Sequence, residues 1–416
     1  MSQKKFIIII FLALVFFTEG CTRNKNPLSA ENPKYQTLPV KPLHKRVIEA
    51  SNSFAFDLFT RVYTQKANEN LFISPFSVSM ALGMTLNGAN GETYTAMQKT
   101  LGFEGMTEQQ INETYRYLYT SLQRLDPKVI FNIANSIWCK QGVDFLPEFF
   151  RVNQTYFNAE VRTLNFADPQ AALTINNWIA RATNQKIKKV LDQIPPEAVM
   201  YLINALYFNG LWTYQFAEDK VREEDFTLLD GTTTNCLMMR VQCKIPIMTE
   251  AGLQVAQLPY GQGNFVMTVI MPTRDAFNNY LQTFNLSEWQ RINARLEEKE
   301  CVIGLPKFRF EFKSQLNKAL IEMGMGIAFT EGRADFSRIS EKQKLFINQV
   351  IHQTFVEVSE KGTEAAAVTV VEVGATSVGP TLPIIVFNRP FLFVISEKST
   401  GTILFMGNVL QPEWRD

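Results

Sequence analysis

The spacing of apolar positions switches repeatedly between the helical and the strand period along the chain. Apolar residues three and four apart predict helices, listed here by range: 47–62, 77–86, 107–125 and 168–184. Runs rich in β-branched and aromatic residues predict strands: 130–138, 200–208, 265–271, 302–310, 345–358, 384–387, 391–395 and 402–405. Because helices come early and strands gather late, the pattern favours an α+β fold over a regular βαβ alternation.

The N-terminal segment has a different pattern from the rest of the chain. Lys4 and Lys5 precede an apolar run of twelve residues, 6–17, which is shorter than the roughly 20 residues that a membrane-spanning helix needs. This arrangement is typical of a secretory signal peptide. Gly20 and Cys21 then resemble the bacterial lipoprotein signal, in which the cysteine becomes the lipidated first residue. The alternative is ordinary cleavage with an incidental Cys21.

Two positions before this cysteine depart from the lipoprotein pattern, since Thr18 stands where Leu is usual and Glu19 where a small residue is usual. Residues 22–45 are polar and carry four prolines, which block helices and central strands. They predict a flexible tether with His44 on the surface. The expected organisation is a signal peptide over 1–20, a lipid-attached tether over 21–45 and one domain over 46–416. The lipid would anchor an exported protein to the cell envelope, facing the periplasm or the outside.

Composition argues against several classes of function. The chain has 416 residues and a net charge of +1, which gives no electrostatic reason to expect nucleic acid. Two histidines, His44 and His352, leave little material for a histidine-rich metal site or a Ser-His-Asp enzyme. The four cysteines other than Cys21 lack zinc-ligand spacing, and Cys236 and Cys243 either pair or remain free thiols. Common nucleotide, hydrolase and metalloprotease motifs are absent from the sequence. We therefore expect no metal and no cofactor.

Length alone suggests two or three domains, but no linker or repeat interrupts residues 47–411. Residues 359–383 are unusual within this stretch. Alternate positions of 363–373 form one uncharged face of an extended chain, while Glu364 and Glu372 lie on the other. The three alanines at 365–367 are weak strand formers. They suit a segment that slides between existing strands. A plain edge hairpin is the alternative, because its side chains would alternate between two faces in the same way.

The residues of 360–367, EKGTEAAA, resemble the hinge of the serpins, the serine protease inhibitor family. The resemblance covers nearly all of 47–412 and includes four further motifs in order: NLFISPFS at 70–77, NALYFNGLW at 204–212, FNRPF at 387–391 and FMG at 405–407. It implies three β-sheets, about nine helices and an exposed reactive-centre loop. In that family a target protease forms an acyl-enzyme on the loop, and the cleaved arm inserts into the large sheet.

The resemblance therefore implies a suicide inhibitor and not an enzyme, with a non-inhibitory binding module as the alternative. It also implies roles for particular residues. The hinge consists of Glu360, Gly362, Thr363, Ala365, Ala366 and Ala367. The polar cluster that controls sheet opening consists of Ser74, Ser77, Asn204 and His352, for which simple core hydrogen bonding is the alternative. Trp212 lies where the arm first enters, and Glu360 pairs with Lys307.

The reactive bond follows from the length of the inserting arm. Inhibitory relatives usually have the reactive bond seventeen residues along from the hinge glutamate, and the same count from Glu360 gives Thr376–Ser377. Counting back from the C-terminal motif points nearer Gly379. The alternatives are Ala375 and Val378. This stretch is small and uncharged, which argues against trypsin-like targets and favours elastase-like or subtilisin-like serine proteases. Cysteine proteases remain open as partners. We expect a monomer that does not bind nucleic acid.

Overall fold

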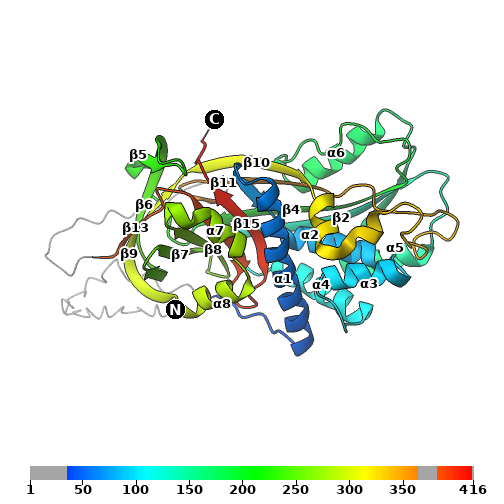
Figure 1. Ribbon diagram of the computed structural model, residues 1–416, viewed down its shortest axis with the longest axis horizontal. Coiled ribbons are helices and arrows are strands. Elements are labelled where there is room, and N and C mark those ends of the chain that lie inside the picture. Colours follow the sequence, from blue (N-terminus) through cyan, green and yellow to red (C-terminus); the bar gives the residue numbers. More distant parts are fainter. Residues whose placement is uncertain (1–34, 364–381, 415–416) are drawn as a thin grey trace, which may run out of the picture. The chain divides into compact units, whose positions relative to one another are not determined.

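The computed structural model describes residues 35–363 and 382–414 (Figure 1). The predicted signal peptide and the lipidation at Cys21 lie outside the described residues, as do part of the hinge and the reactive bond with its alternatives: Ala365, Ala366, Ala367, Ala375, Thr376, Ser377 and Val378. From Tyr35 onward the described residues form one compact unit. Within them, no helix combines the length and the apolar character needed to cross a membrane.

Nine α-helices occur among the described residues: α1 (Pro42–Gln65), α2 (Pro75–Leu86), α3 (Gly91–Thr100), α4 (Glu108–Leu122), α5 (Pro147–Phe157), α6 (Ala171–Ala182), α7 (Phe277–Thr283), α8 (Leu286–Arg295) and α9 (Asn317–Leu320). Local sequence explains several of their starts. Thr107 and Gln110 form a capping box at α4, and the Ser74 side chain caps α2. The four predicted helices are confirmed with small shifts at their ends.

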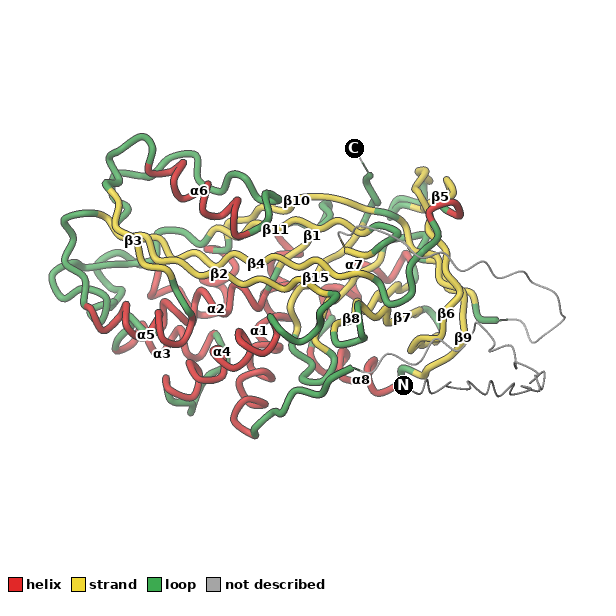
Figure 2. The backbone as a smooth tube through the Cα atoms, turned by 180° about the vertical axis from the view of Figure 1, so that it is seen from behind, coloured by secondary structure: helices red, strands yellow, loops and turns green. Residues whose placement is uncertain are grey.

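A six-stranded sheet runs through the centre of the unit (Figure 2). Its strands, in spatial order, are β10 (Phe308–Gln315), β11 (Ile351–Val358), β12 (Gly362–Thr363), β4 (Met200–Leu211), β2 (Val129–Lys140) and β3 (Glu160–Leu164). On one face it packs against α6, where the rings of Trp138 and Trp178 meet edge to face with centroids 6.1 Å apart. On the other face it contacts α2, which is buried along nearly its whole length.

A nine-stranded sheet makes the second layer. Its path is β1 (Leu71–Ile73), β15 (Ile403–Val409), β14 (Phe391–Glu397), β8 (Phe265–Pro272), β7 (Leu253–Tyr260), β6 (Thr233–Glu250), β9 (Glu297–Pro306) and β13 (Ile384–Val386), with β5 (Arg222–Thr227) beside β6. The long strand β6 pairs with β7 near its end and with β5 and β9 before that. It thus joins two of the three expected sheets into one hydrogen-bonded path, and the α+β architecture is confirmed.

The N-terminal part of the domain differs from the prediction. Helix α1 begins at Pro42, inside the predicted tether, because proline at the first turn lacks only an N–H that the helix does not use. Before it, the Leu38 N–H donates to Ser399 Oγ at 3.0 Å. His44 is 7% exposed and stacks on Tyr117 with centroids 4.3 Å apart. The prediction of a surface histidine was wrong, and residues 35–45 pack on the domain.

Two predicted strands also differ. The strand expected over 345–358 begins only at Ile351, and the one expected over 302–310 divides at Lys307 between β9 and β10.

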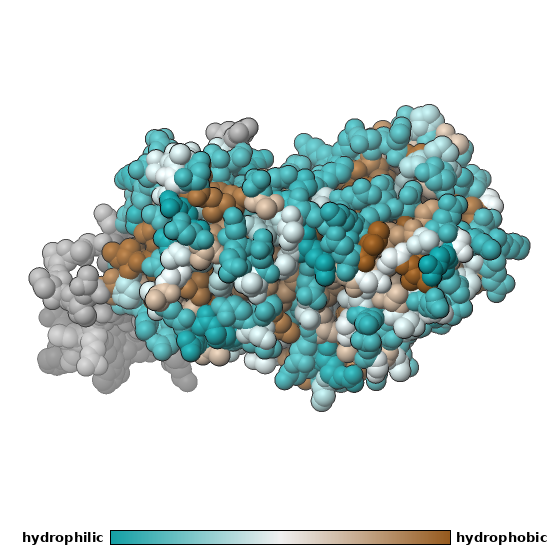
Figure 3. Space-filling view, viewed as in Figure 1, coloured by the Kyte–Doolittle hydropathy of each residue, from teal (hydrophilic) through white to brown (hydrophobic). Residues whose placement is uncertain are grey.

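The face of the molecule seen in Figure 3 is mostly hydrophilic, with apolar patches scattered between polar side chains. Such a surface is ordinary for a globular protein.

Candidate functional site

The hinge is a short strand inserted at one end of the six-stranded sheet. Gly362 and Thr363 form β12 between β4 and β11, in register with Leu211 and Gly210 on one side, while Thr363 opposes Val358 on the other. The backbone before β12 is also fixed, since the N–H of Trp212 donates to the carbonyl of residue 361 at 2.9 Å. The described part of the hinge is therefore already paired as a strand.

Only glycine fits at position 362. Its φ is +154°, a region that side chains rarely adopt. A Cβ built there would lie 2.1 Å from the carbonyl oxygen of Gly210 and 2.8 Å from the Cα of Leu211. Both contacts are with the backbone of β4, which cannot rotate away. The glycine thus allows β12 to approach β4 closely enough to pair.

Thr363 is buried beside Tyr260, which stacks in turn on Trp212. It is 4% exposed, and its Oγ1 lies 2.7 Å from the hydroxyl of Tyr260, whose side chain is fully buried. Burial raises the pKa of Tyr260, so this hydroxyl stays protonated. Tyr260 stacks on Trp212 with centroids 4.3 Å apart, and Trp212 Nε1 donates to the Ser359 carbonyl at 2.9 Å. Trp212 thus contacts the backbone just before the hinge strand, and its role at the entry of the arm stays a prediction. Tyr260 and Ser359 were not predicted.

The predicted pair of Lys307 and Glu360 is present. Lys307 Nζ lies 2.8 Å from Glu360 Oε1, and each side chain is only 13% exposed. A fully exposed pair of this kind would contribute little to stability. The burial of this pair makes the loss of one partner costly instead, because the remaining charge would be left in a poorly hydrated place.

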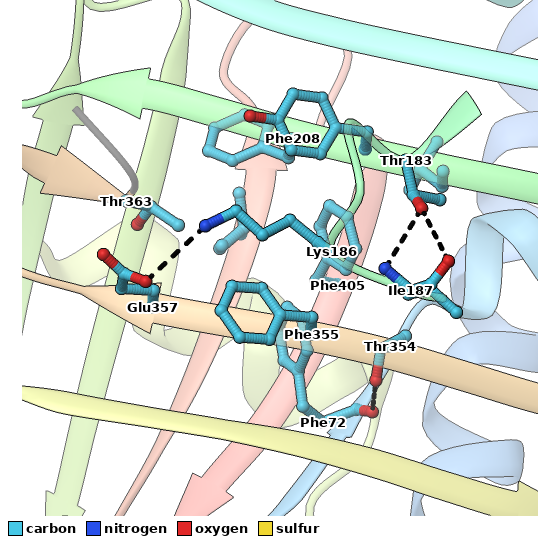
Figure 4. Close-up of a pocket in the computed structure, with 13 residues that line it drawn as sticks. Phe72, Thr183, Lys186, Ile187, Phe208, Thr354, Phe355, Glu357, Thr363 and Phe405 are labelled. Atoms are coloured by element: carbon cyan, nitrogen blue, oxygen red, sulfur yellow. Dashed lines mark hydrogen bonds and ion pairs between the residues drawn. The ribbon is translucent and has the colours of Figure 1, made fainter. Parts of the chain in front are cut away.

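Beyond Thr363, cavities occupy the space between β4 and β11. A small cavity of ≈ 20 Å³ lies beside Thr363 (Figure 4) and is lined by side chains that include Phe208, Phe355 and Phe405. A second, of ≈ 430 Å³, is lined by residues of β4 and β11, by α2 and by residues 343–350. The sheet is thus incompletely filled along the line that β12 begins.

The four residues of the predicted polar cluster lie together beneath this space. The Ser74 N–H donates to His352 Nε2 at 2.9 Å, and the Ser77 hydroxyl donates to Asn204 Oδ1. Ser77 N–H donates to Ser74 Oγ at 3.2 Å. A further member is Asn135, whose Oδ1 accepts from Asn204 Nδ2 at 2.6 Å. The cluster ties α2 to β11 on one side and to β4 and β2 on the other.

Burial determines the charge of this cluster. His352 is 7% exposed, and desolvation lowers its pKa to about 4. The imidazole is therefore neutral at physiological pH, and its Nε2 is free to accept the Ser74 N–H. His352 accepts from the backbone of Ser74, while the Ser74 hydroxyl donates to the Leu404 carbonyl at 2.8 Å. This arrangement suits a structural hydrogen bond, and the role of His352 in sheet opening stays a prediction.

The structure decides whether Cys236 and Cys243 form a disulfide. Cys236 and Cys243 lie on the same strand, β6, seven residues apart, and at ~3.3 Å per residue their Cα atoms are too distant for a disulfide. Cys243 instead faces Cys301 of β9. All four described cysteines are buried free thiols. Among the described residues, no group of three or more His, Cys, Asp or Glu side chains could hold a metal ion.

Known proteins are similar to this chain in both sequence and fold. The family model "Serpin (serine protease inhibitor)" matches residues 49–412. The chain belongs to the serpin family. This serpin is 32% identical to an uncharacterized serpin-like protein of Thermococcus kodakarensis over 99% of its own chain and 100% of the relative. It is also 32% identical to the leukocyte elastase inhibitor of Sus scrofa, over 87% of this chain and 98% of the inhibitor.

Solved structures agree with the serpin fold. Tengpin, a thermophilic serpin in its native state, superposes with a TM-score of 0.80 at 32% identity, covering 90% of this chain and 96% of tengpin. Human thyroxine-binding globulin, complexed with its hormone, superposes with a TM-score of 0.81 at 28% identity, covering 89% and 99%. The family therefore contains both a named elastase inhibitor and a hormone-binding protein.

Proposed function

We propose that this serpin is a suicide-substrate inhibitor of serine proteases and has no catalytic turnover of its own. The observation that carries the proposal is the hinge itself. Gly362 and Thr363 already pair between β4 and β11, and cavities continue along the same line. A strand that begins in place, with space ahead of it, is suited to extension by the residues that follow.

The proposed reaction begins as ordinary proteolysis. The serine Oγ of the target attacks the carbonyl carbon of Thr376, the peptide bond to Ser377 breaks, and the new amine leaves with the C-terminal part of the loop. The target remains attached as an acyl ester. The arm then extends β12, so that residues 363–373 form one strand that spans about 36 Å at ~3.3 Å per residue. Displacement of the attached protease prevents water from completing hydrolysis.

The alternation of side chains between the two faces of the arm supports its insertion. Thr363 faces the buried hydroxyl of Tyr260, so alternate residues up to Val373 would face the same side of the sheet. None of them is charged, whereas an unpaired charge there would resist burial. The two glutamates, Glu364 and Glu372, belong to the opposite face.

The proposed targets have small, uncharged specificity pockets. The residues around Thr376–Ser377 are small and carry no charge, which suits elastase-like or subtilisin-like enzymes better than trypsin-like ones. Similarity to a leukocyte elastase inhibitor supports the same class. Cysteine proteases are a second class of partner.

We further propose that the protein is exported, anchored through lipid on Cys21 to a bacterial cell envelope, and monomeric.

The direct test is incubation with an elastase-like and a subtilisin-like serine protease, followed by denaturing electrophoresis after boiling. The proposal predicts a covalent complex and a released C-terminal peptide that begins at Ser377. If every protease cleaves the loop and leaves fully active, the inhibitory function is wrong. A binding module such as thyroxine-binding globulin would then be the better comparison.

A further inference from the structure

Two of the four described cysteines oppose each other across neighbouring strands. Cys243 of β6 and Cys301 of β9 are paired directly in the antiparallel ladder, so their side chains emerge on the same face of the sheet. That face belongs to the core, since Cys243 is 5% exposed and Cys301 is fully buried. Two thiols are thus enclosed side by side with no metal site and no catalytic partner to account for them.

The geometry of the ladder suits a bond between them. The N–H of Val302 donates to the carbonyl of Pro383 at 2.9 Å, on the side of β9 away from β6. Because successive residues point their backbone groups to opposite sides, Cys301 points toward β6 and forms a hydrogen-bonded pair with Cys243. Such pairs have Cα atoms about 5.5 Å apart, within the ~4.4–6.8 Å range of disulfides. The two β-carbons must approach by ~1 Å for the bond to form.

The two sulfur groups already interact. Cys301 Sγ lies 3.7 Å from the carbonyl oxygen of Cys243, so this side chain points across to β6. Hydrogen bonding between the thiols raises the pKa of Cys243 and lowers the pKa of Cys301. Cys301 therefore forms a thiolate more readily than Cys243, and the thiolate is the form that attacks a disulfide.

The other two described cysteines lack such a partner. Cys139 of β2 opposes Thr163 and Met200, and Cys236 of β6 opposes Glu224 of β5. Both thiols are buried like the facing pair. They serve as internal controls, because a reaction that needs two facing thiols leaves them unchanged.

The facing pair lies beside the strand that follows the reactive-centre loop. Val302, next to Cys301, opposes Ile384 of β13, and the strands β6, β9 and β13 lie next to one another at the end of the nine-stranded sheet (Figure 1). Among the described strands, β13 is paired through β9 alone. A covalent link between β6 and β9 would therefore fix the strand that holds β13.

We propose that Cys243 and Cys301 form a cross-strand disulfide when the chain meets a small disulfide oxidant, R–S–S–R, and that this bond stiffens β9 and β13. The Cys301 thiolate attacks one sulfur of the oxidant, and one R–S⁻ leaves. The Cys243 thiolate then attacks the Cys301 sulfur of the mixed disulfide, so that the protein S–S bond forms and the second R–S⁻ leaves. Two electrons pass to the oxidant, and the two thiol protons end on two R–SH molecules.

This disulfide does not depend on inhibition of any protease. The export proposed above would place the chain where disulfides persist. Because closure draws the two strands together, the bond carries some strain, which makes it more easily reduced than an unstrained structural disulfide.

The test uses oxidised glutathione as the oxidant and the full chain as the protein. One sample is incubated folded at about pH 8, and a second is unfolded in urea and refolded in the same buffer, so that burial does not limit access to the thiols. Both are then denatured, alkylated and digested with trypsin, which releases the facing cysteines in the short peptides 241–244 and 300–307. We expect these two peptides to be linked in at least about half of the refolded molecules, with Cys139 and Cys236 fully alkylated.

Three results overturn the disulfide. The first is alkylation of all four described cysteines in both samples. The second is glutathione retained on Cys301 with no linked peptide. The third is participation of Cys139 or Cys236 in links as often as Cys301, which would indicate random oxidation. None of these measurements needs a variant to fold.

The stiffening is measured by amide hydrogen exchange on the folded chain. Exchange across 299–305 and 384–386 should be at least about threefold slower in the oxidised chain than in the reduced chain. Cys243→Ala treated with the same oxidant is the matched control and should exchange at the same rate with and without oxidant, and Cys301→Ala serves if that variant does not fold. Equal exchange in the oxidised and reduced native chain contradicts the stiffening.

Discussion

Replacing Gly362 by alanine tests whether close pairing of the hinge with β4 is required. The new Cβ would lie 2.1 Å from the carbonyl oxygen of Gly210 and 2.8 Å from the Cα of Leu211. Both are backbone atoms of a strand that also pairs with β2, so the clash cannot be relieved by a side-chain rotation. The variant must either push β12 out of the sheet or distort β4.

The magnitude follows from two contributions. An added methyl in a fully packed place costs about 1–3 kcal/mol. A side chain in a sparsely populated backbone region costs a further ~1–3 kcal/mol, and φ at this position is +154°. Their sum is at least ~2 kcal/mol. A variant that relieves the clash by leaving β12 outside the sheet must bring the hinge back in during insertion, so insertion slows by up to about 30-fold.

The assay is the partition between two products of the reaction with the target protease. Slow insertion gives hydrolysis of the acyl ester more time, so Gly362→Ala should yield mostly cleaved serpin and active protease in place of covalent complex. Gly142→Ala is the matched control, because Gly142 has a φ of +85° but nothing within 4 Å of its added Cβ. A normal yield of complex from Gly362→Ala would refute the steric reasoning. An equal loss in Gly142→Ala would do the same.

Three other predictions concern the buried polar groups. Glu360→Gln should lower the free energy of unfolding by ~1–2 kcal/mol in urea denaturation, because Lys307 loses a charged partner while 13% exposed; an unchanged midpoint would contradict this. The pKa of His352 is lowered from 6.5 to about 4, so the unfolded chain binds the extra proton. Stability should fall by up to ~3 kcal/mol as pH drops through this window, and His352→Gln should lose that slope. Burial raises the pKa of Cys139 to about 12 and of Cys236 to about 11, so native alkylation at about pH 8 should label neither, whereas denatured protein reacts.

Local patterns predicted most of the helices and strands because each element is decided by its own apolar spacing. The exceptions have local causes too. Pro42 was interpreted as a helix breaker but occupies the first turn of α1, where proline is tolerated. Lys307 interrupts one apolar run between two strands that belong to different sheets, and no periodicity within that run distinguishes the two.

The site was predictable only as far as the family motifs reach. They identified Glu360, Lys307 and Trp212, and the structure brings all three to the hinge. Tyr260 was missed because it lies 103 residues from Thr363, its hydrogen-bond partner, and nothing local indicates so distant a contact. The Trp414 ring, whose centroid lies 4.1 Å from Lys307 Nζ, was missed for the same reason, since no local pattern links two residues so far apart in the sequence.

The central claim is that the six-stranded sheet accepts the cleaved arm as a new strand. The most direct measurement compares the thermal midpoint of the intact protein with that of the protein cleaved within the loop. The ten strand residues added after Thr363, at about 0.5–1.5 kcal/mol net per backbone hydrogen bond, contribute roughly 5–15 kcal/mol. The midpoint should therefore rise by ~10 °C or more on cleavage. An unchanged or lower midpoint would mean that the arm stays outside the sheet, and the inhibitory mechanism would fall with it.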